Sequence, residues 1–440
     1  MEAGFGRAVI SMPPGAGLAG YFAPRSNRGV LDDLHARACL LRSRGVTTGV
    51  ICLDLITVTS ELDTAVRRAV EEAGHAFADD LIIAATHTHT GPVIRARQGR
   101  ARSEEAFRSA VAGSAAAVTA AAEDLAPAAL RAGAVDENPF AFNRRFRMQD
   151  GTVVTNPGKL NPEIAGPEGV VDREIGLLAL ERGGAVAGIL LNIVNHTDTV
   201  GGDGVSADWP GFLERALRDG LGTGLTVITL IGAAGNINHF DVSDPEPQTS
   251  YAEARRIGRG YAEIVRKALA GLRSLDATDI RTGRTDVRLR RRSIPEKELS
   301  AARALLAGAG DDLAGAPTSE DLARGDASVK RLFARELVAF AEKEAGTALT
   351  YGMRCIGLGN GLGIVSLPGE PFTEIGLRIK ERSPFATTFV VSHANGSHGY
   401  IPLAECFGRG GYEVLARPGA GLAEETAGVL VESAAKALGL

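Results

Sequence analysis

The chain has 440 residues, enough for a large core, and its content of 45% hydrophobic and 23% charged residues is ordinary for a globular protein. A formal net charge of −5, with no excess of basic residues, argues against nucleic acid as a partner. The sequence also shows no CxxC pair, no run of 18 apolar residues and no basic, apolar leader. We therefore expect a soluble, cytoplasmic protein without stable membrane association, in which Cys39 and Cys52 are buried.

Short apolar runs alternate with alanine-rich stretches along the chain. Ser60 and Asp63 match a capping pattern at the start of the first helical stretch. The other runs are short and almost wholly apolar, as is typical of strands buried on both faces. The pattern predicts strands at 50–55, 81–85, 189–194, 225–231, 364–366 and 388–391, and helices at 60–76 and 103–125. This order predicts an α/β fold with a large mixed β-sheet and flanking helices, and we recognise no internal repeat.

The segment 294–347 has a different composition, rich in Ala, Leu, Glu, Lys and Arg with helical periodicity. A loop at 308–319 interrupts it. We interpret the segment as a helical insertion. A lid, an oligomer contact and a solvated decoration are all compatible with its sequence.

Histidine and other polar residues follow several of the predicted strands. His87 and His89 come directly after 81–85, and residues i and i+2 point the same way if a strand continues through them. The other strand ends carry His196, then Asn236, Asn238 and His239, then Glu370, and finally His393, His398 and Tyr400. Each end alone is more simply a cap or turn, but α/β proteins bind ligands at the carboxyl ends of their strands. The set predicts a metal or catalytic site with nitrogen and oxygen ligands, which suits zinc.

Taken together and in order, these segments resemble the N-terminal catalytic domain of the neutral/alkaline, non-lysosomal ceramidases. The matching pieces are THTHTGP at 86–92, FNR at 142–144, SADWPG at 206–211, GAAGNIN at 232–238, LPGEPF at 367–372, NGSHGYIP at 395–402 and GGYEV at 410–414. The resemblance implies a zinc amidase. In that reading Zn²⁺ is held by His87, His196, Glu370 and Tyr400.

The resemblance also implies roles for residues beside the metal. His89 handles the substrate or a proton, Arg144 faces the reacting carbonyl, and Tyr412 is a second tyrosine near the oxyanion. The stretch at 235–239 lacks the serine found in the family, which favours metal-activated water over an acyl-enzyme.

We expect residues 1–440 to form one zinc-hydrolase domain that contains the insertion. The expected substrate is a small-molecule amide or N-acyl compound rather than membrane ceramide, because we expect no counterpart of the accessory domain of longer ceramidases. An esterase or lactonase on the same site and a non-catalytic metal-binding scaffold are the alternatives. The sequence leaves open a homo-oligomer and a second metal near Asp198, Asp203 or Asp208.

Overall fold

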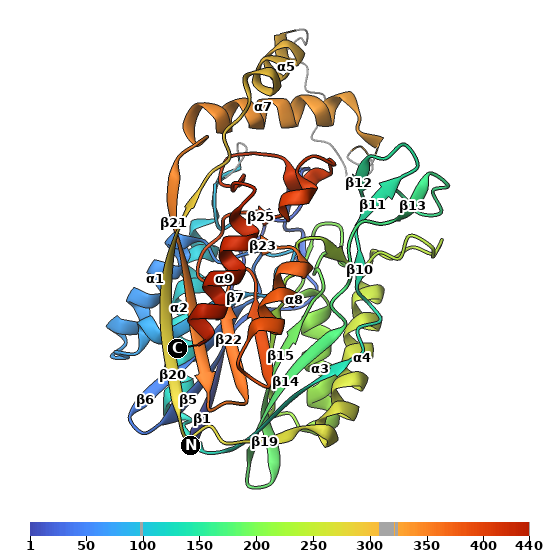
Figure 1. Cartoon of the computed structure of the whole chain (residues 1–440). Helices are drawn as coiled ribbons and strands as arrows, with labels where there is room; N and C mark the ends of the chain where they lie inside the picture. The colour runs from blue at the N-terminus through green and yellow to red at the C-terminus, as the bar shows by residue number, and fades with distance from the viewer. Residues whose placement is uncertain (97–99, 308–320, 322–323, 440) are drawn as a thin grey trace.

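Three sheets with the same strand order form the framework of the computed structural model, which describes residues 1–96, 100–307, 321 and 324–439 (Figure 1). In each sheet the first three strands are antiparallel neighbours, and the fourth pairs in parallel with the third. A helix connects each parallel pair, and a second helix follows. The framework is thus a βββαβα unit repeated three times.

The three units occupy successive parts of the chain. The first contains β1 (Glu2–Ile10), β5 (Leu34–Ser43), β6 (Val46–Leu53), α1 (Ser60–Glu72), β7 (Leu81–Ala85) and α2 (Glu104–Glu123). The second contains β9 (Ala129–Asp136), β14 (Glu174–Arg182), β15 (Ala185–Ile193), α3 (Asp208–Leu221), β17 (Thr226–Ile231) and α4 (Tyr251–Ala268). The third contains β20 (Ile280–Arg290), β21 (Ala348–Leu358), β22 (Leu362–Ser366), α8 (Thr373–Arg382), β24 (Thr387–Val391) and α9 (Thr426–Leu438). Two short strands, β8 (Ala126–Pro127) and β19 (Arg273–Leu275), extend the first two sheets.

The inner faces of the three sheets share one apolar core. Cys52, Leu190 and Ile364, one from each sheet, belong to the same buried cluster. The outer faces are covered by α1 and α2, by α3 and α4, and by α8 and α9. Because these strands are buried on both faces, their sequences are nearly continuous apolar runs. Each Leu or Ile side chain buried in this way stabilises the fold by about 1.5–3 kcal/mol.

The α/β class and the mixed strand directions predicted from the sequence are confirmed. The strands are divided among three main sheets, however, instead of forming one continuous sheet. Cys39 and Cys52 are buried as predicted, each 1% exposed. The expected cap of the first helix was wrong by one residue: Thr59 Oγ1 accepts the Leu62 amide at 3.1 Å, and Ser60 begins the helix.

The helical insertion lies between β20 and β21. It contains α5 (Glu296–Ala307) and α7 (Ala327–Lys343), and the loop predicted at 308–319 lies outside the described residues. Figure 1 shows α7 lying across the top of the molecule. Phe340 of α7 is fully buried, and a Cβ atom added to Gly421 would lie 3.0 Å from its ring. This helix is therefore packed on the segment that precedes α9.

Short strand pairs lie in the loops between the main strands and helices. They are β2 (Gly17–Leu18) with β3 (Arg25–Ser26), β4 (Gly29–Val30) with β16 (Gly204–Val205), β10 (Phe142–Asn143) with β18 (Ile237–Asn238), and β23 (Glu370–Pro371) with β25 (Tyr400–Ile401). A separate three-stranded sheet contains β11 (Arg145–Met148), β12 (Val153–Thr155) and β13 (Ile164–Pro167). None of the helices in the described ranges has the length and apolar character needed to cross a membrane.

Candidate metal centre

The loops that follow the parallel strands of the three units meet at one place. His87 follows β7, His196 follows β15, and Glu370 follows β22. Each unit therefore contributes at least one side chain, from the carboxyl end of its parallel pair, where α/β proteins build their sites.

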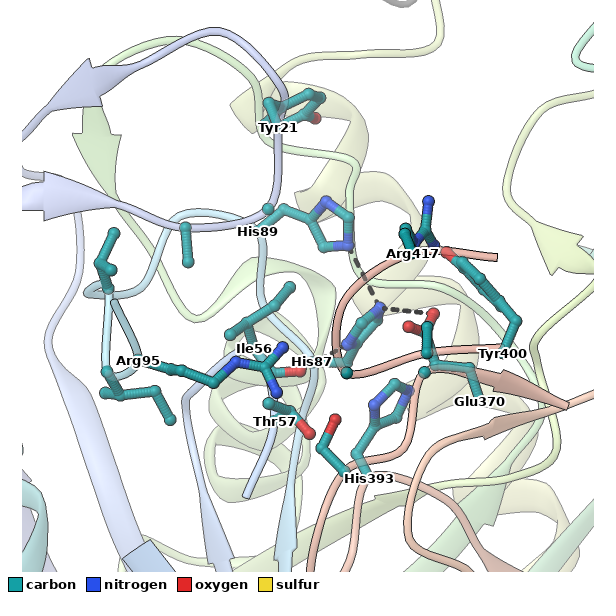
Figure 2. Close-up of a pocket in the computed structure, with 18 of the residues that line it drawn as sticks. Tyr21, Ile56, Thr57, His87, His89, Arg95, Glu370, His393, Tyr400 and Arg417 are labelled. Carbon is teal, nitrogen blue, oxygen red and sulfur yellow. Dashed lines mark hydrogen bonds and ion pairs between the residues drawn. The ribbon is translucent and has the colours of Figure 1, made fainter. Parts of the chain in front are cut away.

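His87 lies at the centre of this cluster (Figure 2). Its Nε2 atom is 3.0 Å from His196 Nε2, 3.2 Å from His89 Nε2 and 3.8 Å from Glu370 Oε2. Its Nδ1–H donates to the Ile56 carbonyl at 2.6 Å. Because that bond occupies the ring proton, the Nε2 lone pair of neutral His87 points into the cluster.

A turn brings the two histidines of THTHTGP together. The strand that precedes them does not continue through His87 and His89, so the expectation that both lie on one strand face was wrong. The strand β7 ends at Ala85, and His87 has a φ of 65°, in the left-handed region. His89 is held by its amide, which donates to the Thr197 carbonyl at 3.2 Å. A left-handed residue other than glycine costs about 1–3 kcal/mol, and such strain is concentrated at functional sites.

The imidazoles of the cluster are neutral. Burial lowers the pKa of His87 and lowers the pKa values of His89, His196 and His393 well below the ordinary value. Neutral histidine is the form that binds metal ions, so the fold holds these side chains ready as ligands.

The donor atoms fit a zinc ion. Ligand nitrogens at about 2.0–2.1 Å from a tetrahedral zinc are roughly 3.3 Å apart, close to the spacings seen around His87 Nε2. Glu370 Oε2 is buried and accepts no hydrogen bond from the described residues, and a bound cation would satisfy it. Among the described residues there are two groups of three donors, and within each group the ligand atoms lie within 4.8 Å of one another. One group is His87, His89 and His196, and the other is His87, Glu370 and His393.

Tyr400, the fourth ligand implied by the resemblance, lies beside Glu370. The strands β23 and β25 pair in parallel with Glu370 opposite Tyr400. Burial raises the pKa of the Tyr400 phenol well above its ordinary value. The structure thus brings His87, His196, Glu370 and Tyr400 to one region, and the ligand role of each stays a prediction.

Arg144 is held next to Tyr400 by a buried network. Its Nε donates to Glu413 Oε1 at 2.8 Å, its Nη2 donates to the Gly235 carbonyl at 2.7 Å, and its Cζ lies 5.1 Å from the Tyr400 ring centre. Burial alone would raise the pKa of Glu413, but Arg144 and Arg145 hold that pKa below its ordinary value. The Arg144 guanidinium is therefore an ion-paired, fixed group.

The three aspartates near His196 have protein partners. Asp198 accepts from His239 Nδ1 at 2.9 Å, and Asp203 pairs with Arg28 at 3.4 Å. Asp208 accepts the amides of Val200 and Trp209 at 2.8 and 2.6 Å. Neither of the two donor groups found among the described residues contains one of these aspartates.

His393, one of the polar residues that follow the predicted strands, joins the cluster although the resemblance gave it no role. Its ring stacks on His87 with centres 3.7 Å apart. It follows β24 by two residues, as His87 follows β7, and it also has a left-handed φ, of 53°. The matching offset in two repeats was the available signal, but it is recognisable only once the threefold topology is known.

A pocket of about 170 Å³ opens onto the cluster. His196 and Arg144 are not among the described residues that line it. Phe22 and Tyr412 line it, and Phe333 of α7 contacts both, with ring centres 6.0 and 5.9 Å apart. The wall includes imidazoles (His87, His89, His393), phenols (Tyr21, Tyr400, Tyr412), arginines (Arg95, Arg100, Arg417) and the carboxylate of Glu370.

The fold and the cluster define an α/β protein whose histidines and glutamate can hold a metal ion at the carboxyl ends of its strands. Two solved structures share this fold. Neutral ceramidase from Pseudomonas aeruginosa matches with a TM-score of 0.74 and 18% identity, over 99% of this chain and 74% of that chain. A ceramidase complexed with C2 matches with a TM-score of 0.74 and 17% identity over the same shares. No protein-family model matches the chain, and no curated protein matches it by sequence. The chain has the neutral ceramidase fold, so the predicted resemblance is confirmed for the fold.

Proposed function

We propose that this protein is a zinc-dependent hydrolase that cleaves a carbon–nitrogen amide bond. The observation that carries the proposal is the meeting of three neutral imidazole Nε2 atoms and the unpartnered Glu370 Oε2 at a pocket, on a ceramidase-like fold. Zn²⁺, when bound, activates a water molecule as nucleophile and polarises the carbonyl.

We assign His87, His196, Glu370 and Tyr400 as the zinc ligands. The positions of His196 and His89 relative to the pocket support giving the ligand role to His196 and the acid–base role to His89. His89 lines the pocket, whereas His196 lies behind the described lining and is 1% exposed. Of these two histidines, only His89 is exposed to a substrate in the pocket, so we assign the proton transfers to His89 and the ligand role to His196.

His89 acts as the general acid and base in this proposal. Its pKa lies well below the ordinary value because it is buried, so it is neutral and can accept a proton from the attacking water. It then donates that proton to the leaving amine, a role worth about 10²–10⁴-fold in rate. Arg144 and Tyr412 are proposed to stabilise the developing oxyanion, although only Tyr412 lines the pocket.

The pocket supports a compact substrate. Its volume of about 170 Å³ is below the range of about 300–1,000 Å³ found for drug-sized ligands. We therefore propose a small-molecule amide or N-acyl compound, processed by residues 1–440 acting as one catalytic domain. The cytoplasmic location and a homo-oligomer stay predictions, which cell fractionation and sedimentation can check.

Matched acyl compounds test the reaction. The zinc-loaded protein is assayed with short N-acyl amides, the corresponding O-acyl esters and lactones, before and after removal of zinc with a chelator. We expect amide hydrolysis that is lost with the metal and restored by zinc. Hydrolysis of esters or lactones alone would replace the amidase by an esterase. If the protein binds stoichiometric zinc but hydrolyses none of these compounds, the alternative of a non-catalytic metal-binding scaffold is supported instead.

A further inference from the structure

Arg417 is a buried cation in the pocket wall. The residue is 3% exposed, and its Nε and Nη1 atoms are buried and find no hydrogen-bond acceptor among the described residues. Figure 2 shows it beside Tyr400, above Glu370. Burying a charge is costly unless it is paired, so this guanidinium requires an explanation.

The other buried arginines of the described chain all have carboxylate partners. Arg37 pairs with Asp54 at 2.8 Å, and Arg67 pairs with Asp63 at 2.9 Å. Arg144 and Arg145 share Glu413, at 2.8 and 2.7 Å. For Arg417, in contrast, no carboxylate of the described residues comes within ion-pair distance, and its Cζ lies over two aromatic rings.

Those faces and a tight turn fix the Arg417 side chain. Its Cζ lies 4.3 Å from the Tyr412 ring centre and 5.3 Å from that of Tyr400. The Ala420 amide donates to the Arg417 carbonyl at 2.8 Å, with Pro418 and a left-handed Gly419 (φ 76°) between them, as in a type II turn. The guanidinium is thus held in place before any ligand arrives.

The charge of Arg417 favours an anion in the pocket. Glu370 is the one carboxylate in its described wall. Glu370 and Glu336 act on Arg417 through the electrostatic field. In the proposed function Glu370 is also committed to the zinc ion, so it does not neutralise Arg417.

We propose that Arg417 binds a carboxylate of the substrate, so that the preferred substrates are amides with a carboxylate close to the scissile bond, such as N-acyl amino acids. A guanidinium presents planar N–H donors that match carboxylate geometry. The carboxylate site rests on the contacts of Arg417. The amide part of the substrate class rests on the proposed function.

Two pairs of probes test this site, each pair differing only in charge. The first is N-butanoylglycine against N-butanoylglycinamide, with the carboxylate on the amine side. The second is N-propylsuccinamic acid against N-propylsuccinamide, with the carboxylate on the acyl side. The ratio of kcat/KM between the charged and the neutral member is measured, and binding of each probe is measured by titration calorimetry. Because both probes of a pair are assayed on the same preparation, the ratio of their kcat/KM values does not depend on the fraction of the protein that is folded.

For the wild type we expect one charged probe to be preferred by about 10- to 100-fold, the range for hydrogen bonds to a charged group. In Arg417→Gln the ratio should approach 1, and in Arg417→Lys it should be intermediate. Arg108→Gln, an exposed arginine of α2, is the control and should keep the wild-type ratio.

The outcomes separate this inference from the proposed function. If no probe is hydrolysed but a charged probe binds and Arg417→Gln weakens that binding at least tenfold, the carboxylate site stands and the amidase fails. If both members of each pair are hydrolysed equally, and Arg417→Gln changes no ratio and no affinity, the inference is overturned and the amidase stands. Equal or absent binding of charged and neutral probes to the wild type likewise overturns the inference.

Discussion

His87 and His196 point their Nε2 atoms at each other from 3.0 Å, although 109 positions separate them in the chain. The Nδ1–H of His87 is committed to the Ile56 carbonyl, so its Nε2 presents only a lone pair. His89 points its own Nε2 at the same atom from 3.2 Å. A cation bound between His87 and His196 would satisfy both of their Nε2 lone pairs, whereas protons alone leave two donors, His196 and His89, sharing one acceptor.

Replacing His87 should remove the metal. We expect His87→Ala to lose stoichiometric zinc and all metal-dependent hydrolysis, because His87 belongs to both donor groups. Zinc per chain is measured by plasma mass spectrometry after dialysis. His75→Ala is the control, since His75 bonds to Thr119 Oγ1 and belongs to neither group. A His87→Ala protein with full zinc content would refute the ligand assignment.

His89 and His196 should respond differently to the same substitution. His196→Ala is expected to lose zinc, because His196 is proposed as a ligand behind the pocket lining. His89→Ala should retain zinc and lose about 10²–10⁴-fold in kcat, the usual contribution of a general acid or base. Zinc content and kcat are measured on both variants. The reverse pattern would exchange the two roles.

A methyl group at Gly20 should displace His89. A Cβ atom there would lie 2.6 Å from the His89 Cβ, and Gly20 has a φ of 101°. We expect Gly20→Ala to retain zinc and to lose activity, because His89 must move. Gly15→Ala is a matched control: its φ is 76°, so it carries similar backbone strain, but its Cβ would meet nothing within 4 Å. Equal kcat values for the two variants would show that the position of His89 does not limit the reaction.

The buried network of Arg144, Arg145 and Glu413 next to Tyr400 should be important for stability. Glu413→Gln removes the charge shared by Arg144 and Arg145, and breaking a buried pair typically costs about 3–5 kcal/mol in the free energy of unfolding. Glu432→Gln, which breaks an exposed pair with Arg382, should cost less than about 1 kcal/mol. Urea unfolding of both variants measures the difference. Similar losses for the two would mean that the buried network contributes little.

His35 should make the fold sensitive to mild acid. Burial, followed by repulsion from Arg37, lowers the pKa of His35 to about 4, below its ordinary value of 6.5. Between these values the unfolded chain binds the additional proton. The stability is therefore fully present above pH 6.5 and falls as the pH drops towards 4, by about 1.4 kcal/mol per pH unit.

The measurement for His35 is urea unfolding of wild type and His35→Gln at pH 7 and pH 5. We expect the wild type to lose about 2 kcal/mol more than the variant over that interval. The pKa of Glu214 lies below its ordinary 4.5, so the stability lost when Glu214 is protonated is lost at a lower pH than this interval. That loss should be common to both proteins. Parallel losses between pH 7 and 5 would exclude His35 as the cause.

The sequence by itself determined the class of the fold and the places where the site could form. The runs at 81–85 and 225–231 could be recognised as strands because burial on both faces leaves only apolar residues in them. His87, His196 and Glu370 could be singled out because polar residues directly after such strands lie at the edge where ligands bind. These inferences use only local pattern, which a single chain displays in full.

Tertiary structure decided how those places meet. The threefold repeat was invisible in the sequence because its units share topology and apolar pattern rather than residue identity. His393 and Arg417 acquired their significance only from neighbours far away in the chain: the His87 ring in one case, and two tyrosine faces without a carboxylate in the other. Whether a buried charge is paired, and which way a left-handed residue such as His87 points, depend on contacts across three sheets. Local sequence does not encode those contacts, and packing of the shared core creates them.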